Sequence, residues 1–247
     1  MLPLRDRLAM LLPPAMFYRR RIARETATGE PELAMLATLV PRGGTAVDVG
    51  ANLGMYAYAL ASIADRVVAF EPNPDYALFA RRMLRGRAAV YEMALSDRAG
   101  SAAFTVPIAD DGMVLHLAGS LKATHSQFRN SATREVKVGT LDSFGFTDVR
   151  FIKVDVEGSE SEVLEGARET IARSRPILLL ELLSGTYQDP AAETAAICAS
   201  FGYDAVLVQH GRTIPALPAI KAIGKNTSWG TEIESRNVLF LPQPALS

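Results

Sequence analysis

The chain has 247 residues, 49% of them hydrophobic, and a formal net charge of -1 at pH 7. This composition supports a sizeable buried core, and the near-neutral charge argues against a duplex-binding surface, which needs a strong basic excess. No stretch reaches the ~18 apolar residues of a membrane span. A lone cysteine, Cys198, excludes an intrachain disulfide and suits a buried structural thiol, so we expect a cytoplasmic protein.

Residues 1–42 are expected to form short helices that cover a sheet or the substrate pocket. Residues 4–12 and 17–26 have helical patterns interrupted by two prolines, and residues 31–40 suit a third helix that starts with a proline. A cluster of four arginines at positions 19–21 and 24 is either a solvated helix face or a contact for an acidic substrate or membrane surface. Residues 43–247 are expected to form a single domain.

The most informative stretch is a strand that runs through a glycine turn into a helix. Residues 45–49 suit a short buried strand that carries Asp48, and residues 55–63 suit a helix packed on a sheet. The turn has G-x-x-x-G spacing at Gly50 and Gly54, which differs from the G-x-G-x-x-G of a dinucleotide site, and it has no P-loop ending. We expect its backbone N–H groups to face a ligand. The acidic residue at the strand end suits a ligand with an amine, such as an amino acid.

A second acidic residue, Glu71, ends the next strand, residues 66–70. It lies about 20 residues beyond the glycine turn, the separation that places a carboxylate on ribose hydroxyls. A ribose joined to an amino-acid head group indicates S-adenosylmethionine. The alternative is that both carboxylates only satisfy a helix start and a turn. The residues predicted to bind the cofactor at these two strand ends are Asp48, Gly50, Asn52, Gly54, Glu71 and Pro72.

The chain continues with a helix at 74–84, a strand at 89–94 and an extra strand at 101–106. A carboxylate just beyond the third strand can accept a hydrogen bond from the adenine amino group, so Ser96 and Asp97 join the predicted cofactor site. The alternative role of Asp97 is that of a turn former.

Residues 107–134 have no clear period and are predicted to form a substrate lid, because a long irregular stretch in a compact domain is usually functional. The lid contains two histidines, His116 and His125. We treat both as catalytic candidates and favour His125.

A second charged stretch ends the strand expected at 151–156. A period of two places Lys153, Asp155 and Glu157 on one side of this strand, at the edge where open α/β sheets bind ligands. We predict Asp155 as a general base, followed by Glu157 and His125. Lys153 is predicted to tune the carboxylates or to lower the pKa of the group that gives up its proton.

Glu181 follows the next strand, 176–180, at the same edge. It is expected to pair with Lys153, or to hold Mg²⁺ or a similar ion together with Asp155, Glu157 and His125. No compact metal-ligand motif is present, so no metal ligands are assigned.

The remaining pattern predicts a helix from about 158 to 172, a helix at 191–201, a strand at 203–208, an irregular segment at 209–236 and a strand at 237–241. Two strands after the last helix suit an antiparallel edge hairpin on a parallel sheet. We therefore predict an α/β fold with the seven-stranded Rossmann-like methyltransferase sheet and helices on both of its faces.

Several stretches together resemble the FkbM family of methyltransferases: residues 47–54 (VDVGANLG), 70–72 (FEP), 94–97 (ALSD), 152–160 (IKVDVEGSE) and, weakly, 237–242 (NVLFLP). The Asp-Val-Glu-Gly run after a lysine is the most specific of them, and the resemblance is good over residues 45–183. It implies S-adenosylmethionine as the methyl donor. It also implies O-methylation of a small-molecule acceptor, at a hydroxyl of a sugar, polyketide or other natural product.

Other functions stay open at this stage. One is a methyltransferase for another small molecule, a nucleic acid or a protein, although the Asn/Asp-Pro-Pro-aromatic turn of nucleobase methylation is absent at 155–158. Another is a non-catalytic module that binds S-adenosylmethionine. An NAD-dependent oxidoreductase is disfavoured by the glycine spacing. The sequence defines neither the acceptor nor the oligomeric state.

Overall fold

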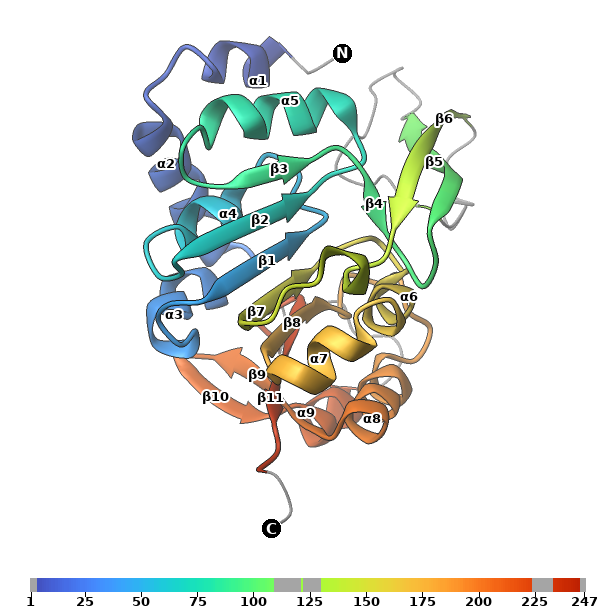
Figure 1. Cartoon of the computed structure of the whole chain (residues 1–247). Coiled ribbons are helices and arrows are strands. Elements are labelled where there is room, and N and C mark those ends of the chain that lie inside the picture. Colours follow the sequence, from blue (N-terminus) through green and yellow to red (C-terminus); the bar gives the residue numbers. More distant parts are fainter. Residues whose placement is uncertain (1–3, 109–120, 122–129, 224–232, 245–247) are drawn as a thin grey trace.

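The computed structural model describes residues 4–108, 121, 130–223 and 233–244. Its main feature is an eight-stranded sheet in the order β10-β9-β11-β8-β7-β1-β2-β3, beside a small sheet in the order β4-β6-β5 (Figure 1). The strands of the large sheet are β1 (Thr45–Val49), β2 (Arg66–Phe70), β3 (Ala89–Tyr91), β7 (Val149–Val154), β8 (Ile177–Glu181), β9 (Tyr203–Gln209), β10 (Arg212–Pro215) and β11 (Asn237–Pro242). Those of the small sheet are β4 (Ala94–Leu95), β5 (Gly100–Ile108) and β6 (Asn130–Gly139).

The centre of the large sheet is parallel. β1 pairs with β2 and with β7, and β7 pairs with β8, so the carboxyl ends of these four strands meet at one edge. β11 is antiparallel to both β8 and β9. The predicted α/β fold with antiparallel strands at one side is thus confirmed. The predicted number of strands in the sheet was one too low, because β10 pairs with β9.

Helices cover both faces of this sheet, as predicted (Figure 1). They are α1 (Leu4–Ala9), α2 (Pro14–Ala27), α3 (Glu32–Leu39), α4 (Met55–Leu60), α5 (Pro74–Met83), α6 (Glu160–Glu165), α7 (Arg168–Ser174), α8 (Pro190–Phe201) and α9 (Ala216–Ile223). Alternate strand residues reach opposite faces. Val47 and Val49 pack in a core with apolar residues of α6 to α9, whereas Ala46 packs in a second core with α2 to α5.

The N-terminal helices pack beside the first strand–turn–helix unit. Tyr18 of α2 is fully buried, donates a hydrogen bond of 2.7 Å to the Leu53 carbonyl, and stacks on Tyr58 of α4 at 4.3 Å between ring centroids. Leu33 and Leu36 of α3 are buried in the same core. The contacts of Tyr18 place α2 next to the glycine turn.

Several predicted elements differ from those observed. The strand expected at 89–94 is two strands that belong to different sheets, β3 and β4. The helix expected at 158–172 is two helices, because the Asp142 carboxylate accepts the N–H groups of Glu169 and Thr170 at 3.0 and 2.8 Å and starts α7. The segment at 209–236 is not irregular throughout, since it contains β10 and α9. Ala216 and Ile220 of α9 pack in the core.

The predicted lid is partly strand. β5 and β6 pair from Gly100 opposite Val138 to Ile108 opposite Asn130, so both ends of the 107–134 stretch belong to an antiparallel ladder. His116 and His125 lie outside the described residues. None of the helices in the described part of the chain is long and apolar enough to cross a membrane.

Candidate active site

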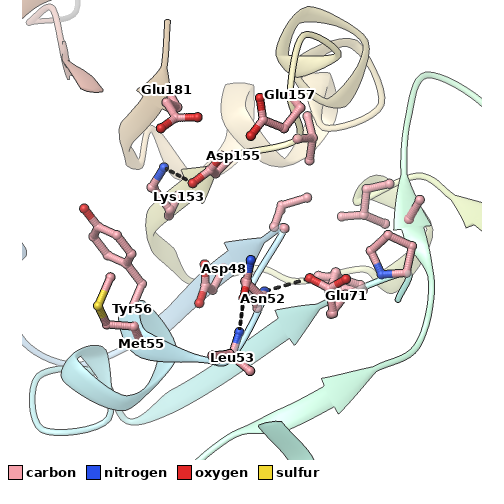
Figure 2. A pocket seen from close by; sticks show the side chains of 18 of the residues that line it. Asp48, Asn52, Leu53, Met55, Tyr56, Glu71, Lys153, Asp155, Glu157 and Glu181 are labelled. Carbon is pink, nitrogen blue, oxygen red and sulfur yellow. Dashed lines mark hydrogen bonds and ion pairs between the residues drawn. The ribbon is translucent and has the colours of Figure 1, made fainter. Parts of the chain in front are cut away.

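An open cavity lies at the carboxyl edge of the parallel strands. Figure 2 shows the carboxylates of Asp48 and Glu71 on one side of it and a charged group from β7 and β8 on the other. The predicted residues that line it are Asp48, Gly50, Asn52, Glu71, Pro72, Lys153, Asp155 and Glu157.

Three predicted cofactor residues do not line the cavity. Gly54 directly precedes α4, and a Cβ atom there would meet the Leu84 side chain at 2.7 Å, so this glycine allows close packing. Ser96 is half-buried and donates to Asp97, which is exposed. The wall expected from these two residues is instead formed by their neighbours Met93, Ala94 and Leu95.

The N–H groups of the glycine turn already have partners in the protein. Those of Gly50 and Ala51 donate to the Phe70 carbonyl at 2.9 and 3.0 Å, and that of Asn52 donates to Glu71 Oε2 at 2.7 Å (Figure 2). The prediction that these groups face a ligand was therefore wrong for this part of the turn. The reason is that the end of β2 lies close enough to accept from them.

Glu71 and Asp48 are both buried and both bonded to backbone. Glu71 Oε1 accepts the Asn73 N–H at 2.8 Å, and Asp48 Oδ2 accepts the Ala57 N–H of α4 at 2.9 Å. Burial raises the pKa of each carboxyl to about 7. Each carboxylate has lone pairs beyond those used by the backbone, so both remain able to accept from a ligand.

The stability of the ligand-free protein should fall as the pH rises from about 4 to about 7. The Asp48 pKa, raised to about 7 from 3.8, means that the folded state keeps a proton that the unfolded chain releases. This contribution is fully present below the unfolded pKa and is lost as the pH passes the folded pKa. In Asp48→Asn the fall should be shallower by about 2–4 kcal/mol, measured by urea unfolding across this range. Parallel curves for the two proteins would contradict this origin.

The glycine turn after β1 and the charged stretch after β7 are in contact at Gly50. The Asp155 N–H donates to the Val49 carbonyl at 3.0 Å, and the Asp155 carbonyl oxygen lies 1.8 Å from where a Cβ on residue 50 would stand. Gly50 also has a φ of +76°, which disfavours other residues. A glycine at this position therefore lets the glycine turn touch the loop that carries Asp155.

Lys153 is buried and forms an ion pair with Asp155. The distance from Nζ to Asp155 Oδ2 is 3.4 Å, and the ammonium lies 5.3 Å from the centre of the Tyr56 ring (Figure 2). Burial alone would lower the pKa of Lys153, but the surrounding carboxylates raise it. Burial would likewise raise the pKa of Asp155, but Lys153 lowers it below the usual value. Asp155 is therefore ionised at neutral pH, as a general base must be.

Glu157 and Glu181 complete the charged group, with carboxylate oxygens of Asp155, Glu157 and Glu181 all within 4.8 Å of one another. Carboxylates this close cannot all ionise. Burial and then Asp155 raise the pKa of Glu157 to about 7 and that of Glu181 well above its usual value. The ion pair of Glu181 is with Arg236 at 3.7 Å rather than with the expected Lys153.

This group does not fit the divalent metal considered from the sequence. The Lys153 ammonium already neutralises Asp155, and protons held by Glu157 and Glu181 compete with a cation. The fourth suggested ligand, His125, is outside the described residues. A metal is therefore not supported.

Five further polar residues line the cavity, Arg21, Glu25, Glu30, Tyr56 and Arg236. Sequence reasoning missed them because they lie outside the recognised motifs. Arg236 donates to Glu30 at 2.9 Å and lies 3.8 Å from Glu25, so it links the segment before β11 to the N-terminal part of the chain. Arg21 belongs to the predicted basic cluster, but nothing in the sequence separates it from Arg19 and Arg20, which are exposed.

An open α/β sheet of this order, with a glycine turn after β1 and carboxylates at the ends of neighbouring strands, defines a Rossmann-like methyltransferase fold. The model of the family described as the methyltransferase FkbM domain matches residues 48–210. The chain belongs to this family, which confirms the resemblance drawn from its motifs.

Two relatives illustrate the range of similarity. The chain is 28% identical over 144 residues to the 2-O-methyltransferase NoeI of Sinorhizobium fredii, a match that covers 52% of this chain and 59% of that protein. The crystal structure of methyltransferase FkbM from Methylobacillus flagellatus KT matches with a TM-score of 0.55 and 17% identity, over 92% of this chain and 50% of that one. The matches thus span only 59% and 50% of the length of these two relatives.

Proposed function

We propose that the chain is an O-methyltransferase that transfers the methyl group of S-adenosylmethionine to a hydroxyl of a small-molecule acceptor. The observation that carries the proposal is the juxtaposition, across one cavity, of the Asp48 and Glu71 carboxylates with the Lys153–Asp155 pair. The first two residues suit the donor, and the pair suits removal of a proton from the acceptor. A sugar, polyketide or other natural product remains the expected acceptor.

The charges that line the cavity fit this donor. Seven carboxyl groups line it (Glu25, Glu30, Asp48, Glu71, Asp155, Glu157 and Glu181), against three cationic side chains (Arg21, Lys153 and Arg236). Burial raises the pKa of Asp48 and of Glu71 to about 7, so a bound cation would favour the ionised form of both. S-adenosylmethionine, when bound, supplies an electrophilic methyl group on a positively charged sulfur. Asp48 would hold the amine of its amino-acid end, and Glu71 would accept from its ribose hydroxyls.

The acceptor side of the cavity would be formed by Arg21, Glu30 and Arg236. Their packing would hold the acceptor hydroxyl against Asp155, and holding reacting atoms together supplies much of the acceleration in a displacement. Asp155 would take the hydroxyl proton, with Glu157 as the next candidate because a pKa near 7 suits a general base. His125, which lies outside the described residues, is still a catalytic candidate on the evidence of the sequence alone.

The name of NoeI supports the choice of oxygen as the methylated atom. The near-neutral net charge supports a small molecule over a nucleic acid as the acceptor. The lone cysteine is consistent with the proposed cytoplasmic location.

The test has two stages. Calorimetry with S-adenosylmethionine measures donor binding, and a methyl-transfer assay over a panel of hydroxylated small molecules then measures turnover. Binding followed by transfer to oxygen supports the proposal. Binding without transfer to any acceptor class favours the non-catalytic module, and no binding removes the proposal.

Glu71→Ala should weaken S-adenosylmethionine binding by about 1–3 kcal/mol, because ribose hydroxyls and the Asn52 N–H lose their acceptor. Calorimetry of wild type and variant measures the difference. Glu92→Ala is the matched control. Glu92 directly follows β3, the neighbouring strand, and its exposed carboxylate forms an ion pair with Arg81. Equal affinities for the Glu71 and Glu92 variants would remove Glu71 from the donor site.

A further inference from the structure

Lys153 is held by more than its ion pair with Asp155. Nζ donates to Asn237 Oδ1 at 2.9 Å, at the start of β11, and to the Val154 carbonyl at 3.4 Å. Other charged groups that act on Lys153 include Glu181 of β8, Glu30 of the segment before α3 and Asp48 of β1, and Lys153 in turn acts on Glu32 of α3. Asn237 is thus the neutral side chain that shares the ammonium with these carboxylates.

The Asn237 amide lies between a donor and an acceptor. Its Oδ1 faces the Lys153 ammonium, and its Nδ2 donates to Glu32 Oε2 at 3.4 Å. An ammonium only donates and an ionised carboxylate only accepts. Both charged groups therefore favour the same orientation of the amide, and without Glu32 the Nδ2 end loses its acceptor, so that Lys153 alone holds the Asn237 side chain in place.

Glu32 is itself fixed in place. It is the first residue of α3 and is 1% exposed. The Ser235 hydroxyl donates to Glu32 Oε1, and Ser235 Oγ accepts the Asn237 N–H at 2.9 Å. Burial raises the pKa of Glu32 to about 7, so Glu32 is ionised above neutral pH. All three residues of this relay, Glu32, Ser235 and Asn237, lie outside the 48–210 stretch that defines the family.

We propose that Glu32 is a positioning residue that acts through the Asn237 amide to hold the Lys153 ammonium against Asp155. The two ends of the chain thereby set the charge of the group expected to act as base. The catalytic meaning of this relay rests on the proposed function, whereas the orientation of Lys153 does not. The relay can therefore be tested on the protein alone, without donor or acceptor.

Nuclear magnetic resonance of the lysine ammonium groups at about pH 8, where Glu32 is ionised, tests the relay. The Lys153 signal is assigned by its loss in Lys153→Met. Asn237→Leu should speed exchange of the Lys153 ammonium protons about tenfold or more, because one hydrogen bond to a charged group is lost. Glu32→Leu should act in the same direction but more weakly. Tyr203→Phe, which removes another buried hydrogen bond, from Tyr203 to the Pro176 carbonyl at 2.7 Å, should leave the signal unchanged.

If Asn237→Leu does not fold, the relay is tested by exchanging the carboxylate of Glu32 and the amide of Asn237, which conserves the net charge. The double variant Glu32→Gln with Asn237→Asp places an amide donor opposite a carboxylate acceptor and keeps an oxygen facing Lys153. Its Lys153 signal should stay as protected as in wild type. Unchanged exchange in folded Asn237→Leu and Glu32→Leu overturns the proposal, and so does fast exchange in the double variant. Loss of methyl transfer without a change in the Lys153 signal counts against the relay and not against the proposed function.

Discussion

Replacement of Asp155 by asparagine is expected to lower the turnover number of methyl transfer by about 10²- to 10⁴-fold, the range typical of a lost general base. Asparagine keeps the shape of the side chain but cannot accept the hydroxyl proton. The Lys153 ammonium, 3.4 Å away in the native protein, also loses its ion pair. Steady-state kinetics gives the turnover number, and calorimetry measures donor affinity separately.

Asp148→Asn is the matched control for this variant. Asp148 precedes β7 at the end opposite Asp155, and its half-exposed side chain bonds to Thr45 and Arg66. It should change turnover little. If Asp155→Asn retains the turnover of the control while Glu157→Gln loses it, the role of base passes to Glu157, whose pKa of about 7 suits it.

Gly50→Ala is expected to lower the free energy of unfolding by about 3–5 kcal/mol and to abolish donor binding. The new Cβ would stand 1.8 Å from the Asp155 carbonyl oxygen, which belongs to the backbone and cannot rotate away. The turn and the Asp155 loop must therefore separate. Chemical unfolding and donor calorimetry measure the two effects.

Gly86→Ala separates this clash from backbone strain. Gly86 has a φ of +75°, nearly that of Gly50, but a Cβ there would meet nothing within 4 Å. The cost of this change should be only about 1 kcal/mol, the cost of a left-handed residue. Similar losses of stability in the two variants would show that the contact with Asp155 is unimportant.

Local patterns were sufficient to predict the parallel core of the fold. β1 and β2 have the predicted bounds, since short β-branched runs between turns read directly as buried strands. The residues at the carboxyl ends of β1, β2 and β7 were predicted because a parallel sheet brings such ends together. The sequence pattern therefore gave both sides of the cavity around Asp48, Glu71 and Asp155.

What the sequence could not supply are contacts between distant segments. No local sequence pattern indicates that the Gly50 N–H donates to the Phe70 carbonyl, or that the Asp142 side chain caps a new helix that begins at Arg168. Arg236 and Glu30 meet across 206 positions of chain, and their place at the cavity follows from packing alone. A strand pattern at 89–94 likewise gives no sign that the chain leaves one sheet for another.

The position of β11 has a consequence for synthesis of the protein. β11 is antiparallel to β8 on one side and to β9 on the other, although both are made before it. A nascent chain on the ribosome therefore exposes two unpaired strand edges until residue 242 has emerged, and such edges invite pairing with other chains. Products truncated before residue 237 should accordingly be the forms most prone to aggregation and to degradation by proteases.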